Sequence, residues 1–178
     1  MTDDVMFMNE AIAEARLAAE EDEVPVGAIV VRDGEIIARA HNTRERDKNA
    51  LRHAECAAID AACRALGGWR LPDCTLYATM EPCPMCAGAV VNSRIVRVVY
   101  GAHDKRAGAF GSVLDLNAYP LNHKPEVVGG ICEEECVALL RDFFKRKRSG
   151  GKPPLCKGRW RRSRRRDCYK AKNNPSVT

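Results

Sequence analysis

The sequence predicts an α/β fold in which a sheet of five strands is covered by helices on both faces. Segments whose apolar residues recur every three or four positions alternate with short runs rich in valine, isoleucine and threonine. This alternation along the chain favours a layered α/β arrangement over separate helical and sheet regions. Apolar residues form 46% of the 178 residues, which is enough to close one core.

The chain begins with an amphipathic helix and a hairpin. Asp3 and Asp4 can cap the helix. The positions expected to be buried along it recur at intervals of three and four: Val5, Met8, Ile12, Ala15 and Ala19. Strands are expected next at residues 26–31 and 36–40, because Asp33-Gly34 between them is a two-residue signal for a tight antiparallel turn.

A loop, a second helix and a third strand follow. Residues 41–52 are polar and lack periodicity, so we expect a loop there. An alanine-rich helix is expected over residues 53–66, where Gly67-Gly68 stops it. The next apolar run predicts a short strand at residues 75–79.

The next segments predict a third helix, a fourth strand and a long loop. A helix is expected over residues 84–92, because Pro84 suits the first helical position. Residues 95–100 have the composition of a buried strand. Residues 101–124 are rich in glycine, alanine, asparagine and proline, so we expect a long functional loop with one helical turn.

A last strand and a last helix complete the predicted domain. The strand is expected at residues 126–128 and the helix at residues 133–148. The helix residues expected to be buried are Val137, Leu140, Phe143 and Phe144. Beyond Ser149 the chain has few core-forming residues, so we expect a domain of residues 1–148 and a weakly ordered arm of residues 149–178.

Charge is divided unevenly between the two ends of the chain. Residues 1–144 contain 15 basic and 23 acidic residues, whereas residues 145–178 contain 14 basic and 1 acidic. An acidic body with a basic arm predicts a polyanionic partner, and a nucleic acid is the obvious one. The chain has no run of about 18 apolar residues and no export signal, so no membrane association and a cytoplasmic location are expected.

Two short motifs supply candidate metal ligands. They are His53-Ala54-Glu55 and Pro82-Cys83-Pro84-Met85-Cys86. One imidazole and two thiolates are ligands that zinc prefers, so we expect one zinc ion on His53, Cys83 and Cys86. A structural zinc site is usually closed by a fourth protein ligand, whereas three ligands leave a position for water and indicate a catalytic metal.

The same motifs supply a proton carrier. A zinc ion can lower the pKa of its bound water toward about 7, so that hydroxide is available at neutral pH. Glu55 is expected beside that water, because a carboxylate that is not a ligand can carry protons from the water to the ring and to the departing nitrogen. In a regular helix His53 and Glu55 would diverge, so we expect them to share a pocket at an irregular first turn. His-x-Glu with Pro-Cys-x-x-Cys is the known signature of zinc nucleobase deaminases.

Beyond this signature, residues 5–148 resemble the bacterial tRNA-specific adenosine deaminase family. The segments that carry the resemblance are Val24-Pro25-Val26-Gly27-Ala28, Asn42, His53-Ala54-Glu55, Thr75-Leu76-Tyr77, Glu81-Pro82-Cys83-Pro84-Met85-Cys86-Ala87-Gly88-Ala89, Ser93-Arg94-Ile95, Val99-Tyr100-Gly101-Ala102, Gly111-Ser112, Asn122-His123 and Asp142-Phe143-Phe144. The resemblance implies a cytidine-deaminase-like three-layer α/β/α fold with a mixed central five-stranded sheet. It also implies a homodimer that deaminates adenosine to inosine at the wobble position of a tRNA anticodon.

The resemblance further implies residues that contact the substrate. Asn42 is expected to hydrogen-bond the flipped base, with Ala54 and Pro82 beside it, and Asp104 is expected near the anticodon backbone. On the final helix the expected RNA contacts are Phe143, Phe144 and Arg146. The basic run of residues 157–166 with Trp160 can grip phosphates and stack bases, or can be a solvated tail.

Several alternatives stay open at this point. The zinc motif is shared with deaminases of free nucleobases or nucleotides, such as cytosine, guanine or deoxycytidylate, and an inactive RNA-binding module could keep the zinc. Cys132 and Cys136 could form half of a second metal site, although buried core cysteines are expected there. His103 and His123 could contact RNA or be ordinary loop histidines. The chain has Ala50-Leu51-Arg52 where the family has Pro-Thr-Ala.

Overall fold

The computed structural model describes residues 3–150. The chain divides into a compact unit of residues 1–144 and a second unit of residues 145–178. Most of the predicted basic arm, residues 151–178 with Trp160, lies outside the described residues. None of the helices within residues 3–150 combines the length and apolar composition needed to span a membrane.

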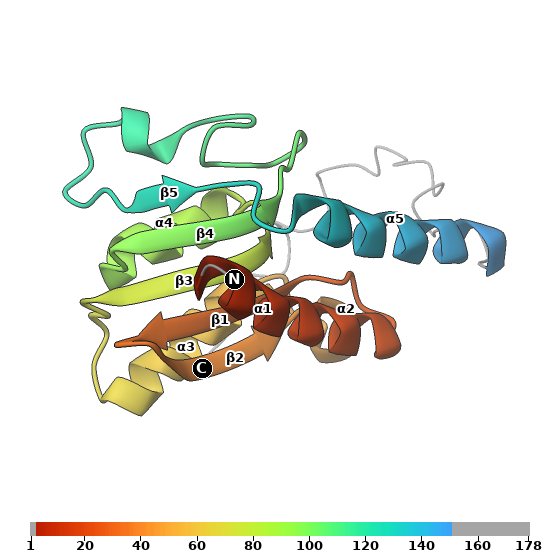
Figure 1. Ribbon diagram of the computed structural model, residues 1–178, viewed down its shortest axis with the longest axis horizontal. Helices are drawn as coiled ribbons and strands as arrows, with labels where there is room; N and C mark the ends of the chain where they lie inside the picture. Colours follow the sequence, from red (N-terminus) through yellow and green to blue (C-terminus); the bar gives the residue numbers. More distant parts are fainter. Residues whose placement is uncertain (1–2, 151–178) are drawn as a thin grey trace, which may run out of the picture. The chain divides into compact units, whose positions relative to one another are not determined.

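The predicted mixed five-stranded sheet is confirmed (Figure 1). Its order is β2-β1-β3-β4-β5. The strands are β1 (Gly27–Arg32), β2 (Glu35–His41), β3 (Cys74–Met80), β4 (Arg97–Ala102) and β5 (Glu126–Val128). β1 pairs antiparallel with β2 and β3, whereas β4 pairs parallel with β3 and β5.

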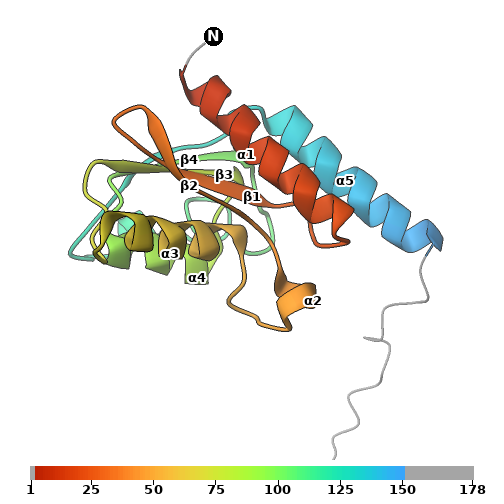
Figure 2. The same ribbon diagram turned by 90° about the horizontal axis from the view of Figure 1, so that it is seen from below.

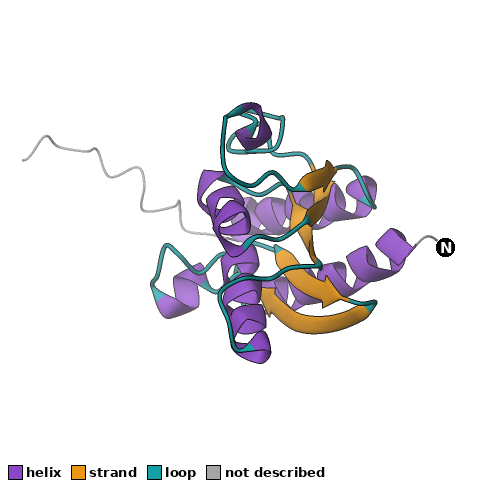
Figure 3. Ribbon diagram, turned by 90° about the vertical axis from the view of Figure 1, so that its left-hand side faces the viewer, coloured by secondary structure: helices purple, strands orange, loops and turns teal. Residues whose placement is uncertain are grey.

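Helices cover both faces of this sheet. The long helices are α1 (Asp3–Glu20), α3 (Ala54–Leu66), α4 (Pro84–Ser93) and α5 (Glu133–Gly150). Figure 2 shows α3 and α4 on one face of the sheet and α1 on the other. Figure 3 shows the same helix, sheet and helix layers, so the predicted three-layer α/β/α fold is confirmed.

The core consists of two apolar clusters separated by the sheet. Neighbouring strand residues alternate between them, because successive side chains of a strand point to opposite faces. Val30, Leu76 and Val98 pack with α3 and α4. On the other face, residues of β1, β3 and β4 pack with α1 and with the start of α5: Ile29, Tyr77, Val99, Phe7, Met8, Ala11, Ile12 and Cys136. Strands buried on both faces explain the nearly continuous apolar runs in the sequence.

The predicted hairpin turn between β1 and β2 is confirmed. Asp33 and Gly34 have φ angles of 50° and 77°. Two consecutive positive φ angles are those of the turn that matches the twist of an antiparallel pair. Asp33 is one of the few residue types apart from glycine that tolerates this conformation.

The prediction of an unstructured loop at residues 41–52 is wrong in part. A single helical turn, α2 (Arg44–Asp47), lies there. The buried Glu23 carboxylate accepts a hydrogen bond from the Arg46 amide at 2.7 Å, and Thr43 Oγ1 donates to Asp47 Oδ2 at 2.7 Å. These polar contacts stabilise a turn that has no apolar face, so hydrophobic periodicity could not predict it.

The predicted buried faces of the first and last helices also need correction. In α1 the buried residues are Phe7, Met8, Ala11, Ile12, Ala15 and Ala18, whereas Val5 and Ala19 are only partly buried. In α5 Cys136 and Phe143 are buried, Leu140 is partly buried, and Val137 and Phe144 are 42% and 43% exposed. The predicted burial of Leu140 and Phe143 is therefore confirmed, whereas Cys136 replaces Val137 in the contact stripe and only one of the two neighbouring phenylalanines is buried.

Candidate metal centre and active site

The three predicted metal ligands lie at the beginnings of two helices. His53 is the N-cap residue of α3, and Cys83 is the N-cap residue of α4. Cys86 lies in the first turn of α4, three residues further along. Helix N-termini carry partial positive charge from their unpaired amides, which favours the thiolate form of a nearby cysteine.

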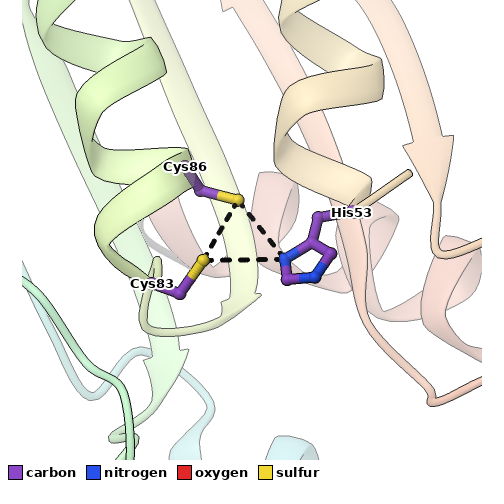
Figure 4. Close-up of side chains that lie close together, drawn as sticks. All are labelled: His53, Cys83 and Cys86. Atoms are coloured by element: carbon purple, nitrogen blue, oxygen red, sulfur yellow. Dashed lines mark hydrogen bonds between the residues drawn. The ribbon is translucent and has the colours of Figure 1, made fainter. Parts of the chain in front are cut away.

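The ligand atoms form a small triangle (Figure 4). His53 Nδ1 lies 3.6 Å from Cys83 Sγ and 3.5 Å from Cys86 Sγ, and the two sulfurs are 3.7 Å apart. With ordinary bond lengths, a tetrahedral zinc ion separates two thiolates by about 3.8 Å and a thiolate from an imidazole nitrogen by about 3.6 Å. The observed triangle therefore fits one face of a zinc tetrahedron.

Within residues 3–150 these three side chains are the one group whose ligand atoms all lie within 4.8 Å of one another. A third thiol, that of Cys56, lies 3.7 Å from Cys86 Sγ but is not part of this group. A tetrahedral ion held by the triangle would keep one position for a ligand from outside these residues. This arrangement supports the expectation of a catalytic rather than a structural metal.

The two thiols differ in their readiness to ionise. A hydrogen bond with Cys86, opposed by burial and reinforced by a hydrogen bond with His53, lowers the pKa of Cys83 to about 3. The hydrogen bond with Cys83 raises the pKa of His53. Hydrogen bonds with Cys56 and Cys83 raise the pKa of Cys86. The Cys83 thiol therefore loses its proton more readily than the Cys86 thiol, and a metal ion has to displace a proton from Cys86.

Glu55 lies two residues beyond His53 and is almost fully buried, with 3% exposure. His53 has extended backbone angles, with φ −79° and ψ 148°, so it precedes the helix rather than lying in it. The irregular first turn that the motif required is therefore present, and both side chains line one pocket. Burial raises the pKa of Glu55, so the carboxyl is suited to gaining and losing a proton nearer neutral pH.

A pocket of about 140 Å³ adjoins the metal ligands. Its lining consists of Val24, Val26, Asn42, Arg44, His53, Glu55, Met80, Glu81, Cys83 and Asp104. Asn42 Oδ1 accepts a hydrogen bond from the Ala54 amide at 3.0 Å, which fixes the orientation of its side chain. The structure thus places Asn42 and Asp104 in the same pocket as His53, Glu55 and Cys83.

Other predicted substrate contacts lie elsewhere. Ala54 is completely buried behind Asn42, and Pro82 accepts the Ala109 amide at 2.9 Å through its carbonyl. On α5 the rings of Phe143 and Phe144 meet edge to face with centroids 5.4 Å apart. None of these four residues lines the pocket. Arg146 belongs to the second unit of the chain.

The remaining cysteine and histidine alternatives can be compared with the structure. Cys74 and Cys136 are buried and Cys56, Cys63 and Cys132 are partly buried, whereas Cys156 and Cys168 lie outside the described residues. Cys136 packs in the core, and Cys132 lies against it, as expected for core cysteines. His123 Nε2 is 2.6 Å from the Ile95 carbonyl, which is the local hydrogen bond of an ordinary loop histidine.

Sequence reasoning missed two polar residues of the pocket, Arg44 and Glu81. Arg44 lies in the short helix α2 that periodicity did not predict. Glu81 was visible in the motif before Pro82-Cys83, but the motif alone assigns it no role. The signal that could have identified Glu81 was its position between a buried strand and the turn with the metal ligands. A carboxylate in a buried position needs hydrogen-bond donors around it.

Comparisons with known proteins support the same assignment. The profile of the MafB19-like deaminase family matches residues 2–148. A tRNA-specific adenosine deaminase from Bacillus subtilis (strain 168) is 54% identical over 146 residues, which cover 82% of this chain and 91% of that protein. The similarity therefore covers the whole unit that contains the metal centre.

Solved structures share the fold as well. One comes from studies of A-to-I editing by tRNA:A34 deaminases at the wobble position of transfer RNA. It is 46% identical, has a TM-score of 0.74, and the match covers 76% of this chain and 99% of that chain. A guanine deaminase from Nitrosomonas europaea is 25% identical with a TM-score of 0.66, and the match covers 78% of this chain and 83% of that chain.

Proposed function

Because this chain belongs to the tRNA-specific adenosine deaminase family, we propose that it deaminates adenosine to inosine at the wobble position of a tRNA anticodon. The family model and the similar proteins confirm the resemblance to this family that the sequence predicted. One observation carries the proposal. The ligand atoms of His53, Cys83 and Cys86 are separated by the distances that a zinc ion requires, and the buried carboxyl of Glu55 lines the adjoining pocket. The zinc ion is proposed, one per chain, on these three side chains.

The residues of the pocket divide the reaction among them. A bound zinc ion would supply the Lewis acidity that activates a water molecule at neutral pH. Glu55 takes one proton from the attacking water as the water oxygen bonds to C6 of adenine, and passes it to the ring nitrogen. Glu55 then moves the second proton of that water, from the oxygen now on C6, to the amino group, so that the C6–N bond breaks and ammonia leaves. Asn42, held by the Ala54 amide, orients the base through its side-chain amide.

The experiment for this function compares substrates. The purified protein is incubated with unmodified tRNA carrying adenosine at the wobble position, and separately with free cytidine, cytosine and guanine. We expect inosine in the tRNA and no conversion of the free compounds. Deamination of guanine or of a cytosine compound instead would favour the free-nucleobase alternative. Guanine is included because the fold is similar to that of a guanine deaminase. Zinc binding without any conversion would favour an inactive RNA-binding module.

Asp104 in the pocket and three residues of α5 are proposed to hold the RNA. Asp104 lies at the rim of the pocket, where it can contact the anticodon backbone. Phe144 on α5 is 43% exposed and offers a ring on which a base can stack. Phe143 is buried and supports that ring from the side. Arg146 follows two residues later and supplies positive charge.

The basic arm of residues 149–178 is proposed to add affinity that does not depend on RNA sequence. Each phosphate contact made by a basic side chain releases counterions, so binding weakens as salt rises. We expect truncation after Arg148 to weaken tRNA binding and to flatten the plot of log Kd against log salt. Fluorescence anisotropy at several salt concentrations measures both quantities. An unchanged slope would show that the arm does not bind the RNA.

A homodimer is also proposed, formed through the face of α4. An apolar groove of about 460 Å³ lies beside this helix, lined by Gly88, Val91, Asn92, Leu114, Leu116, Tyr119 and Leu121. Tyr119 is 56% exposed and Leu121 39% exposed. Exposed apolar surface gathered in one groove is characteristic of protein interfaces. A second copy of the chain is the occupant that the family resemblance implies.

Sedimentation equilibrium tests this interface. We expect Leu121→Lys to shift the protein toward monomer, because a lysine ammonium would have to be buried in an apolar contact. Leu17→Lys is the matched control, since Leu17 is similarly exposed on α1, across the sheet from α4. A wild-type protein that stays monomeric at high concentration would contradict the proposal.

A further inference from the structure

Glu81 has no assigned role, although its carboxylate is completely buried. It follows β3 and directly precedes Pro82 and the metal ligand Cys83. Its backbone amide donates to the Ala102 carbonyl at 2.8 Å, which ties the end of β3 to the end of β4. The residue therefore sits where the metal-binding turn meets the long loop that follows β4.

The Glu81 side chain organises that loop. Oε2 accepts a hydrogen bond from the Asp104 amide at 3.1 Å. Oε1 accepts two, from the amides of Phe110 at 3.0 Å and Ser112 at 3.1 Å. One carboxylate thus gathers both ends of the segment 104–112. Among these residues Asp104 lines the active-site pocket.

The loop is fitted closely around the carboxylate. A Cβ atom placed on Gly108 would collide with the carboxyl group of Glu81, so only glycine lets the chain pass there. The Gly108 amide donates to the Asp104 carbonyl at 2.8 Å, and the Ala109 amide donates to the Pro82 carbonyl at 2.9 Å. The metal-binding turn and the loop are therefore joined by the hydrogen bond from Ala109 to Pro82 as well as by the three bonds to the Glu81 carboxylate.

The carboxylate accepts three hydrogen bonds from backbone amides, those of Asp104, Phe110 and Ser112. Backbone amides that point at a buried carboxylate stabilise its negative charge, and the ring nitrogen Nδ1 of His103 lies 3.8 Å from Oε2. A neutral side chain of the same size could not accept all three bonds.

We infer that Glu81 is a positioning residue for RNA recognition, which holds Asp104 at the rim of the pocket in a fixed place relative to Cys83. The inference rests on the proposed function, because Asp104 is taken to contact the anticodon. The main observation is that one buried carboxylate binds the Asp104 amide while its own peptide segment leads straight into the metal ligand. Glu81 acts through Asp104 and does not touch the reacting atoms.

Glu81→Gln tests this by exchanging one carboxylate oxygen for an amide NH₂ group. The glutamine oxygen can still accept from Phe110 and Ser112, but its amide group then faces the Asp104 N–H, donor against donor. The reverse orientation would lose two bonds instead of one. We expect the apparent KM for an anticodon stem-loop to rise about tenfold or more, with a smaller fall in kcat and an unchanged zinc content. Glu35→Gln, an exposed glutamate on β2, is the matched control.

A double-mutant cycle with Asp104→Ala separates positioning from general damage. If Glu81 acts through Asp104, Glu81→Gln adds little to KM when Asp104 is already alanine. Gly108→Ala disturbs the same contact from the loop side and should show the same dependence on Asp104, which keeps the test usable if Glu81→Gln folds poorly.

Three outcomes would overturn the inference. They are an equal rise in KM with and without the Asp104 side chain, a fall in kcat at unchanged KM, and loss of zinc from a folded Glu81→Gln protein. Failure of the proposed function is distinguishable, because the wild-type protein would then leave adenosine in the stem-loop unconverted.

Discussion

Replacing Glu55 with glutamine is expected to lower kcat for tRNA deamination by about 10²- to 10⁴-fold, which is the usual contribution of a positioned general acid and base. Glutamine keeps the size and polarity of the side chain but cannot accept the water's proton. Because Glu55 is outside the group of metal ligands, the variant should retain one zinc per chain. Single-turnover assays with tRNA and metal analysis of the same sample measure the two quantities.

The pH dependence of the same pair of proteins gives a second measurement. Burial raises the pKa of Glu55 above its ordinary value of 4.5. The carboxyl has to be ionised to take a proton, so wild-type kcat should fall on the acidic side through an apparent pKa above that value. The glutamine variant should lack this acidic limb. Loss of zinc from Glu55→Gln, or a kcat close to wild type, would show that the role of Glu55 is misassigned.

Burial of Glu55 also affects how the free energy of unfolding changes with pH. A carboxyl whose pKa is higher in the folded protein is bound to its proton more tightly there than in the unfolded chain. Its contribution to stability is therefore present at low pH and is lost as pH rises through the folded-state pKa. In metal-free protein above that pH, Glu55→Gln should unfold at a higher temperature than wild type.

Features fixed by neighbouring residues could be predicted from the sequence. The turn at Asp33-Gly34 needs two residues that tolerate positive φ, and it lies where expected. The extended backbone of His53 followed from requiring His53 and Glu55 to share one pocket. In these cases the physical cause lies within a few residues of the signal.

Features that depend on distant partners could not be predicted in the same way. Glu81 is 23 residues from Asp104 and 31 from Ser112, and no local pattern reveals their hydrogen bonds. The short helix α2 depends on Glu23, which lies 23 residues before Arg46. Val137 and Phe144 fit a helical apolar stripe as well as Cys136 does, and only the packing partners of α5 decide which positions are buried.

The group of His53, Cys83 and Cys86 depends on both a local spacing and a distant partner. The spacing of Cys83 and Cys86 is local, because two residues three positions apart at the start of a helix can face one ion. His53 is 30 residues from Cys83, so the sequence motif identified the ligand without placing it. The structure brings the first turns of α3 and α4 together on the same face of the sheet. The sequence therefore predicted which residues form the group that could hold a metal ion, and the fold supplies the distances.

Replacing Cys86 with serine is expected to remove zinc and, with it, nearly all deaminase activity. A hydroxyl is a poor zinc ligand compared with a thiolate, and the two remaining ligands cannot hold the ion in its tetrahedral face. Treating the wild-type protein with a strong chelator should have the same effect, reversed by added zinc. Metal analysis after dialysis, together with kcat on tRNA, measures the loss.

Cys56→Ser is the control that makes this prediction specific. Cys56 Sγ is as close to Cys86 Sγ as Cys83 Sγ is, at 3.7 Å, yet it is not part of the ligand triangle. We therefore expect Cys56→Ser to keep its zinc. Loss of zinc from that variant would make Cys56 a fourth ligand and would argue for a structural metal. Retained zinc and activity in Cys86→Ser would remove the triangle as the metal site.

The affinity for zinc should also rise with pH, for a reason visible in the site. Hydrogen bonds with Cys56 and Cys83 raise the pKa of Cys86, so its thiol keeps a proton that the ion has to displace. Release of one proton strengthens binding by about tenfold per pH unit below that pKa. Competition titrations with a chromogenic chelator from pH 6 to 8 would measure the slope. A flat profile would mean that both thiols are already ionised, and the hydrogen bond between Cys86 and Cys56 would then have no effect on metal binding.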